Sequence, residues 1–534
     1  MKRCQNRTSP NHADEVRRVM IGTEMASVRL GLMIVALVIA SLLAGCGRTA
    51  PSSPASPEAK TNAPKAKLPT RSISGSADHA QESREPVEPS SRNMPSATLS
   101  SNPDELQAQS QPIHRPDDLR PKHDDRKLAE AGIRLYESKR LKLYTDINAE
   151  AAGALPSLID AVYLVWVDYF GEMPRDRAGT DFQMTGYLIK DEALFREAGL
   201  VPEDLPMFEH GRHRRNEFWM REQKYDYFRR HLLIHEATHC FMTFMPGVDA
   251  PVWYIEGMAE YFATHRVAQD GSVSFRVMPT SSEDFAGWGR IKAIRDEFSA
   301  NTGKSITKLI AMPPVEFLRP EPYAWSWALC QFLDAHPRYR ERFQKLGDHL
   351  QERAFSREFE AAFDADSRDL NTEWLLFVSN LQYGYEATRA AIDFQPGRFL
   401  TADRPLHRLD IAADRGWQSS GVLLETGKTY EINASGRFTL ADQPKPWESE
   451  PQGITFRYFD HRPLGLLIGC IRAEEGNAGG DNDPMLKIVE IGRGRSLKAP
   501  LTGTLYLRLN DAWNSLSDNR GLVSVDIRRP QTEK

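Results

Sequence analysis

Three scarcities limit what this chain can be, and cysteine is the first. The 534 residues contain five cysteines, too few and too scattered for a disulfide framework. Cys4 and Cys46 fall in the N-terminal segment, which leaves Cys240, Cys330 and Cys470. We expect these three to be buried as small apolar side chains, with one bridge between two of them as the alternative.

Net charge is the second scarcity. The formal charge is −5 at pH 7, so neither a nucleic-acid partner nor a strongly acidic surface is expected. The short basic run at 212–215 is interpreted as a solvated loop or the edge of a strand. A chain of 534 residues is too long for one ordinary domain, and two or three are expected.

Long apolar runs are the third scarcity. Residues 30–45 are almost all apolar, but this run is shorter than the roughly 20 residues that a bilayer-spanning helix needs. Its length and the preceding Arg29 are typical of the apolar part of an export signal. The run ends in Leu43-Ala44-Gly45-Cys46, which resembles the bacterial lipobox.

The resemblance implies a lipoprotein signal peptide over residues 1–46, with Cys46 as the lipidated residue. The chain would then be exported and lipid-anchored to a bacterial membrane, on the periplasmic or cell-surface side. An uncleaved anchor is the alternative, and it would also place the rest of the chain outside the cytoplasm.

Residues 47–125 are rich in Pro, Ser, Ala and charge and have almost no large apolar side chains. Such a segment cannot bury enough surface to offset the loss of chain entropy on folding. We expect a disordered tether over these residues, with ordered sequence beginning near Lys127.

Residues 126–398 are expected to form a mainly helical domain with a small sheet. Apolar residues recur at helical spacing over 149–170, and short apolar runs at 184–189 and 217–220 predict strands. Helical patterns return from Tyr225 onwards and between Tyr323 and about Ala391.

Residues 235–239 read H-E-A-T-H. Positions four apart lie on one face of a helix, so the imidazoles of His235 and His239 can reach one Zn²⁺. Glu236 is then placed beside the metal, where it can take a proton from a bound water. His231 shares the face but lies about 12 Å from His239 along the axis, so it is not expected to be a third ligand.

A third ligand is expected from the next helix. The loop at 245–251 ends in Pro251, which favours the start of a second helix. An antiparallel second helix would bring Glu256 back to the metal. Glu260, one turn further on, could hydrogen-bond a ligand histidine.

H-E-A-T-H followed by P-x-W-x-x-E-G-x-A-E-Y resembles the gluzincin metallopeptidases, and most of all the peptidase MA-like bacterial families. The resemblance covers about 141–343 and implies zinc ligands His235, His239 and Glu256, with Glu236 as general base. Residues 322–326 (P-Y-A-W-S) fall where gluzincin aminopeptidases carry a Pro-Tyr-x-x-Gly segment, which implies that Tyr323 stabilises the oxyanion.

The sequence also departs from this family. It has no G-x-M-E-N segment, so an aminopeptidase specificity is not implied. A strand over residues 216–220 could instead pair with an extended peptide.

Residues 404–530 have a different pattern, with short alternating runs divided by Gly, Asp, Asn and Pro. Seven runs predict strands, which indicates a β-sandwich or jelly roll and an α+β fold class for the chain. The runs are 421–424, 429–434, 454–458, 464–471, 486–491, 504–509 and 522–527.

The segment 505–527 resembles the PA-I-type galactophilic lectins, through L-Y-L-R-L-N-D, D-N-R-G and V-S-V-D-I. The resemblance implies a Ca²⁺ site with side-chain ligands Asp511, Asp518 and Asn519 and the carbonyl of Ser515. In that family the calcium contacts a galactose-type glycan. The family's sugar-binding histidine has no clear counterpart here, so calcium as a structural staple and a plain β-sandwich are both alternatives.

The sequence therefore favours a membrane-tethered zinc metallopeptidase that hydrolyses peptide or protein substrates. One alternative is a non-catalytic envelope or carbohydrate-binding lipoprotein that acts through the C-terminal domain. Another is a zinc hydrolase of a non-peptide amide.

The lipoprotein hypothesis predicts that Cys46→Ser removes the site of lipidation. The variant should move from the membrane fraction to the soluble fraction, or be mislocalised, when the cells are fractionated. Unchanged membrane partitioning would contradict lipidation at this cysteine.

Overall fold

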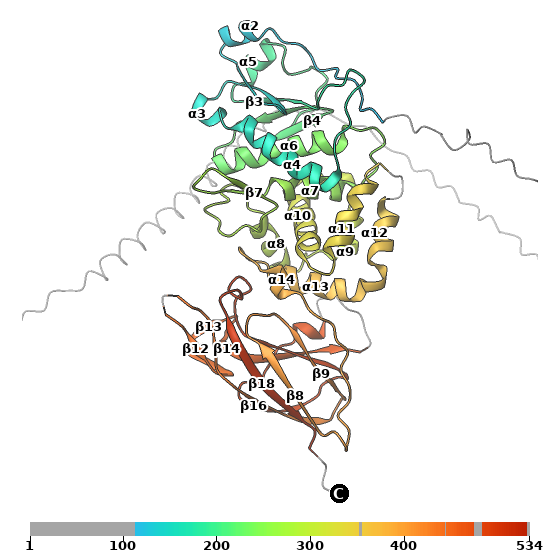
Figure 1. Ribbon diagram of the computed structural model, residues 1–534, viewed down its shortest axis with the longest axis vertical. Helices are drawn as coiled ribbons and strands as arrows, with labels where there is room; N and C mark the ends of the chain where they lie inside the picture. Colours follow the sequence, from blue (N-terminus) through green and yellow to red (C-terminus); the bar gives the residue numbers. More distant parts are fainter. Residues whose placement is uncertain (1–112, 352–354, 444, 475–482, 531–534) are drawn as a thin grey trace, which may run out of the picture. The chain divides into compact units, whose positions relative to one another are not determined.

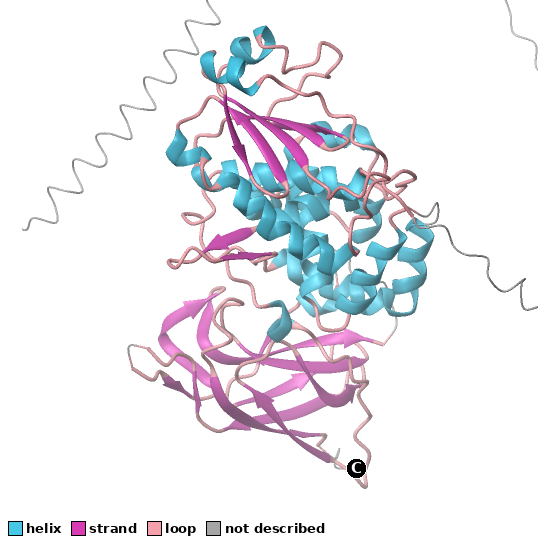
Figure 2. Cartoon of the chain, turned by 45° about the horizontal axis from the view of Figure 1, so that its top comes forward, coloured by secondary structure: helices cyan, strands magenta, loops and turns pink. Residues whose placement is uncertain are grey.

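The structure is a computed structural model that describes residues 113–351, 355–443, 445–474 and 483–530. The chain is mixed α+β (Figures 1 and 2). The expected signal peptide, including Cys46, and the expected tether up to residue 112 lie outside the described residues.

The N-terminal part of the described chain combines a sheet with many helices. Its helices are α2 (Asp125–Glu130), α3 (Ala149–Ala152), α4 (Leu155–Phe170), α5 (Glu192–Glu197), α6 (Asp226–Thr243), α7 (Val252–Ala263), α8 (Arg290–Ser299), α9 (Ile306–Ile310), α10 (Pro320–Ala335), α11 (Arg340–Lys345), α12 (Phe355–Phe363), α13 (Ser367–Ser379) and α14 (Ala387–Ala390). Its strands are β1 (Arg134–Glu137), β2 (Leu141–Thr145), β3 (Met184–Ile189), β4 (Gly211–Arg214), β5 (Glu217–Arg221), β6 (His265–Val267) and β7 (Val273–Phe275). The helix expected over 149–170 is interrupted after α3, and Pro156 lies in the first turn of α4.

Five strands form one sheet in the order β1-β2-β3-β5-β4, with β2, β3 and β5 parallel and the outer two antiparallel to their neighbours. Alternate side chains point to opposite faces. Leu143, Leu188 and Met220 join the cluster that contains α4 and α6, whereas Tyr187 and Trp219 belong to a separate cluster on the other face. The sheet is therefore buried on both faces, and β4 is the edge strand nearest α6 (Figure 1).

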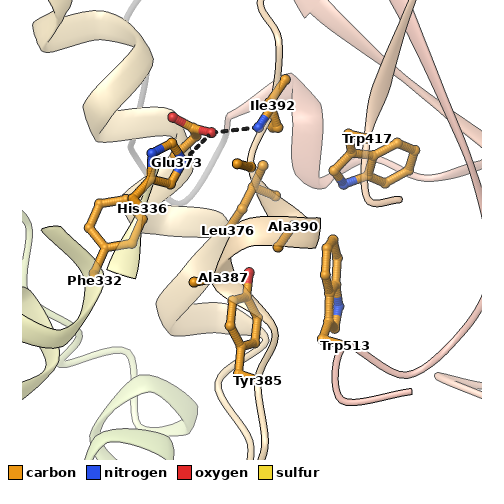
Figure 3. Close-up of a pocket in the computed structure, with 11 residues that line it drawn as sticks. Phe332, His336, Glu373, Leu376, Tyr385, Ala387, Ala390, Ile392, Trp417 and Trp513 are labelled. Carbon is orange, nitrogen blue, oxygen red and sulfur yellow. Dashed lines mark hydrogen bonds and ion pairs between the residues drawn. The ribbon is translucent and has the colours of Figure 1, made fainter. Parts of the chain in front are cut away.

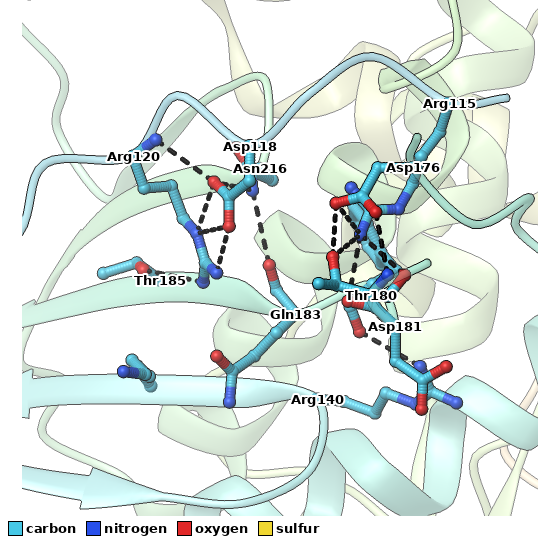
Figure 4. A network of polar contacts seen from close by, with 12 residues as sticks. Arg115, Asp118, Arg120, Arg140, Asp176, Thr180, Asp181, Gln183, Thr185 and Asn216 are labelled. Atoms are coloured by element: carbon cyan, nitrogen blue, oxygen red, sulfur yellow. Dashed lines mark hydrogen bonds and ion pairs between the residues drawn. The ribbon is translucent and has the colours of Figure 1, made fainter. Parts of the chain in front are cut away.

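Residues 113–124 belong to the folded part, which corrects the expected end of the tether at 125. Arg115 is 3% exposed and donates to Asp176 (3.2 Å) and to the carbonyls of Thr180 and Asp181 (Figure 4). Arg120 bonds Thr185 on β3 (3.1 Å). The composition of 47–125 concealed this attachment, because it depends on a few charged side chains and not on apolar burial.

Helices α6, α7 and α10 form the framework of the domain. Pro251 caps α7, as expected from the loop before it. Gly257, in the middle of α7, allows α10 to approach closely, because a Cβ here would lie 2.7 Å from the Ser326 carbonyl oxygen and from the Cys330 sulfur. Glycine at this position therefore determines how closely α7 packs against α10.

The C-terminal part is a sandwich of two sheets, ordered β12-β11-β18-β10-β16 with β8 on β18, and β13-β14-β17-β9 with β15 on β14. The inward side chains of both sheets form one cluster. The strands are β8 (Leu406–Ala412), β9 (Gln418–Leu424), β10 (Thr429–Ser435), β11 (Phe438–Thr439), β12 (Glu448–Ser449), β13 (Gln452–Phe459), β14 (Arg462–Ala473), β15 (Val489–Glu490), β16 (Gly494–Lys498), β17 (Gly503–Leu509) and β18 (Arg520–Arg528). Of the expected strand at 486–491, only β15 is a strand, because Pro484–Leu486 forms a 3₁₀ turn.

A buried carboxylate attaches the segment after α13 to the helical domain. Glu373 accepts hydrogen bonds from His336 Nε2 (2.9 Å) and the Ile392 amide (2.7 Å) (Figure 3). It also accepts one from the Tyr339 hydroxyl (2.6 Å). The cavity beside it, lined also by Trp417 and Trp513, has room for about one water molecule, so it is not a ligand site.

The cysteines at 240, 330 and 470 are free and buried, so the alternative of a bridge between two of them is not observed.

Candidate metal and catalytic site

Three ligand atoms from α6 and α7 converge on one position. The Nε2 atoms of His235 and His239 are 3.0 Å apart, and Glu256 Oε2 lies 3.4 Å from the first and 3.1 Å from the second. Helical spacing places the two histidines on one face of α6, and the return of the chain through α7 brings Glu256 opposite them. The convergence expected from the sequence is therefore present.

These residues fit a zinc ion. Ligand atoms about 2.0–2.1 Å from a tetrahedral zinc are separated by roughly 3.3 Å, close to the separations observed here. Two imidazoles and one carboxylate also form a common set of protein ligands for a catalytic zinc. Although burial opposes it, the facing imidazoles of His239 and His235 hold the pKa of Glu256 below its usual range, so this side chain is in the carboxylate form that binds metals.

A second cluster, His231, His235 and Glu260, shares His235 with the first. It is a poorer metal site, because Arg290 donates to both oxygens of Glu260, at 3.1 and 2.8 Å. Despite burial, Arg290 and His231 hold the pKa of Glu260 well below its usual range. Glu260 Oε1 is 3.5 Å from His235 Nδ1, beside the histidine as expected, but the two make no hydrogen bond in the structure.

His231 is buried and not solvent-facing, with its ring nitrogens 3.0 Å from the Ala263 carbonyl and 3.2 Å from Glu260. It therefore joins α6 to α7 beside the ligands. Arg290, which the sequence analysis did not identify, comes from α8, and no local motif marks it.

Glu236 lies between α6 and the edge strand β4. Its side chain is buried, and a Cβ at Gly211 would lie 2.4 Å from its Oε1 atom. The carboxylate therefore fits only because residue 211 is a glycine. Burial raises the pKa of Glu236 above its ordinary value, although His235 and His239 oppose the effect.

His213 also faces the site from β4. Its ring stacks on that of His239, with centroids 4.5 Å apart, and its Nδ1 lies 3.9 Å from Glu236 Oε2. Burial, and then the neighbouring His239, lower the pKa of His213 to about 3, so the ring is neutral near pH 7. The run 212–215 was expected to be a solvated loop or the edge of a strand. It does form an edge strand, but His213 points inward, which the basic pattern of the run did not indicate.

The expectation that residues 216–220 pair with a peptide is wrong. That strand is β5, which is already paired with β3 on one side and β4 on the other. The free edge belongs to β4.

Tyr323, in the first turn of α10, lies near the metal ligands. Its ring centroid is 6.2 Å from that of His235, and the Arg290 guanidinium lies 5.8 Å from the Tyr323 ring. Burial, followed by the charges of Glu256 and Glu236, raises the pKa of Tyr323, so the phenol stays protonated.

Part of the expected calcium set comes together in the loop between β17 and β18. Asn519 Nδ2 donates to Asp511 Oδ2 (2.8 Å), and burial raises the pKa of Asp511 to about 6. One side-chain oxygen of Asp518 and one of Asn519 are buried without a hydrogen-bond partner. Ser515 lies in the same loop, but no described contact joins it to the other three.

Arg508, which was not expected from the sequence, also contributes to this loop: it donates to the Asp511 carbonyl (2.6 Å) and lies 3.7 Å from the Trp513 ring centroid.

No family model matches the chain, and no curated protein sequence matches it. A solved structure titled "EclA N-terminal domain; PllA-like lectin" is 23% identical and covers 24% of this chain and 98% of its own, with a TM-score of 0.19. The periplasmic g-type lysozyme inhibitor PliG of Aeromonas hydrophila is 8% identical and covers 26% of this chain and 100% of its own, with a TM-score of 0.16. At such scores, neither likeness shows what the chain does.

The geometry predicts one zinc per chain. Glu256→Ala should lose the metal during dialysis against a weak chelator, because two imidazoles alone remain. Glu260→Gln should weaken zinc binding by about tenfold or more through its loss of support for His235. Glu236→Gln, the matched control, should retain the metal, as measured by elemental analysis. Equal zinc content in the Glu256→Ala variant would contradict the ligand assignment.

Proposed function

We propose that this chain is a zinc-dependent peptidase of the gluzincin type. The observation that carries the proposal is that His235, His239 and Glu256 point at one position. Beside them lies a buried Glu236 that makes no hydrogen bond to any described residue. The glutamate is therefore available to a water molecule and to a substrate.

His235, His239 and Glu256 would hold a zinc ion, which would supply an activated water and polarise the bond to be cleaved. Glu236 would accept a proton from that water at its carboxylate, which makes no hydrogen bond to a described residue. The same group can then pass that proton to the leaving amine. Tyr323, as a neutral phenol, is available to donate a hydrogen bond to the oxygen on which negative charge develops.

The edge strand β4 offers a place for an extended peptide. The Arg221 amide donates to the His210 carbonyl (2.7 Å), and alternation in an antiparallel pair then directs the backbone groups of Arg212 and Arg214 toward β5. The backbone groups of Gly211 and His213 therefore face the free edge. A peptide that bonds to them would run alongside Glu236.

The alternative functions would require different features at this cluster of residues. A structural zinc closes its coordination with a fourth protein ligand, whereas this described cluster offers three. A non-catalytic protein would also have no need for Glu236 in its buried position. Hydrolysis of a non-peptide amide uses the same residues, so the substrate has to be tested directly.

A peptide library should be cleaved by the zinc-loaded chain, and Glu236→Gln should lower kcat/KM by about a thousandfold with zinc retained. Gly211→Ala should lower it by about tenfold to a hundredfold, because the added methyl group displaces the Glu236 carboxylate. Gly153→Ala, whose Cβ would meet only the Ala149 carbonyl of its own helix, is the matched control and should retain activity. Zinc binding without cleavage of any peptide would favour a non-peptide substrate.

We also propose that the loop from Asp511 to Asn519 binds calcium. The supporting observation is the pair of buried oxygens, on Asp518 and Asn519, that lack a partner next to a buried carboxylate. Oxygen ligands of this kind suit Ca²⁺, and a cation would also offset the repulsion between Asp511 and Asp518. A galactose-type glycan as partner follows from the sequence resemblance alone.

Calcium titration calorimetry of the full chain should give one binding event in addition to the zinc site. Asp511→Ala should abolish it, because the central carboxylate is lost. Asp526→Ala on β18, where the side chain pairs with Arg408 (3.0 Å), is the control and should leave binding unchanged. Absence of calcium binding by the wild type would remove this site from the proposal.

Attachment to a bacterial membrane through Cys46 is proposed from the lipobox alone. In this arrangement the peptidase would act outside the cytoplasm on peptides or proteins that reach the membrane surface.

A further inference from the structure

Arg212 is an uncompensated positive charge next to the proposed catalytic glutamate. Its side chain is exposed, and the described residues include no carboxylate within ion-pair distance of it. Its neighbours in β4 are Gly211, which packs on Glu236, and His213, 3.9 Å from the same carboxylate.

Other charges along this edge do not neutralise Arg212. Arg214 already pairs with Asp204 (3.1 Å), and its guanidinium lies 5.5 Å from the Trp219 ring centroid. Glu209 is highly exposed and lies beside His210 (3.9 Å). Arg215, in the turn after β4, adds a second exposed cation without a described ionic partner. The free edge of the sheet is therefore positively charged.

Strand geometry indicates what Arg212 can contact. Gly211 and His213 face α6, so Arg212 points to the opposite face of the strand, as Arg214 does. When a peptide adds to a strand edge, side chains at paired positions point to the same face. A substrate residue paired with Arg212 would therefore present its side chain to the guanidinium and away from the metal ligands.

We infer that Arg212 selects peptide substrates that carry an acidic side chain flanking the cleaved bond. The inference rests on the proposed peptidase function and deepens it by naming the substrate class. An arginine suits this role, because its charge is permanent and its planar group binds a carboxylate in a bidentate manner.

Two pools of short degenerate peptides, identical except that one carries Glu where the other carries Gln, provide the test. The zinc-loaded full chain should cleave the Glu pool with a kcat/KM about fivefold higher, as expected for a solvent-exposed ion pair. Arg212→Glu should reverse the preference. Arg177→Glu, which makes the same change of charge at an exposed position after α4, should leave it unchanged. The preference should also shrink in 1 M salt, where the screening length is about 3 Å.

A binding measurement separates this inference from the peptidase proposal. Fluorescent versions of the two pools are titrated into Glu236→Gln and into Glu236→Gln combined with Arg212→Glu. Cleavage of both pools at equal rates would overturn the role of Arg212 and leave the peptidase intact. If neither pool is cleaved, the peptidase proposal fails. In that case the inference is still supported if Glu236→Gln binds the Glu pool more tightly than the Gln pool and the double variant does not. Equal binding of the two pools, or no binding, would overturn it.

Discussion

The close approach of α6 and α7 is the constraint on which the site depends. Three ligand atoms lie within 3.4 Å of one another only because Glu256 on α7 faces the two histidines of α6. Gly257, the residue after this ligand, lets α10 pack against α7, since a Cβ here would collide with the Ser326 carbonyl. The position of the metal ligand and the packing of the core are therefore determined by adjacent residues.

Three glutamates in this small region have different electrostatic environments, and the charges around them explain why. Glu260 is neutralised by Arg290 and so can support His235 without competing for the metal. Glu256 faces two imidazoles, which favour its ionised form. Glu236 has no such direct partner, so burial dominates and raises its pKa. Identical side chains thus differ in ionisation because their neighbours differ, as the proposed roles in support, ligation and proton transfer require.

Much of the zinc cluster could be predicted from the sequence, because its signals are local. The spacing of His235 and His239 needs only one helix, and Pro251 marks where the next helix begins. Arg290, Gly211 and His213 could not be found in this way, since they come from α8 and β4 and meet Glu260 or Glu236 only in the folded chain. The strand at 217–220 was correctly expected, but its place inside the sheet depends on pairing, which hydrophobic pattern does not specify.

The loop between β17 and β18 differs from the zinc site in what balances its charge. At the proposed zinc site each carboxylate other than Glu236 faces a cationic or imidazole partner from a different helix. In the loop, Arg508 donates to the backbone carbonyl of Asp511 and not to its carboxylate. Burial raises the pKa of that carboxylate, and repulsion from Asp518 raises it further. Buried oxygens without partners cost free energy unless something pairs with them. A bound cation would supply that pairing, whereas an added hydrogen-bond donor would satisfy one oxygen and leave the repulsion between the two aspartates in place.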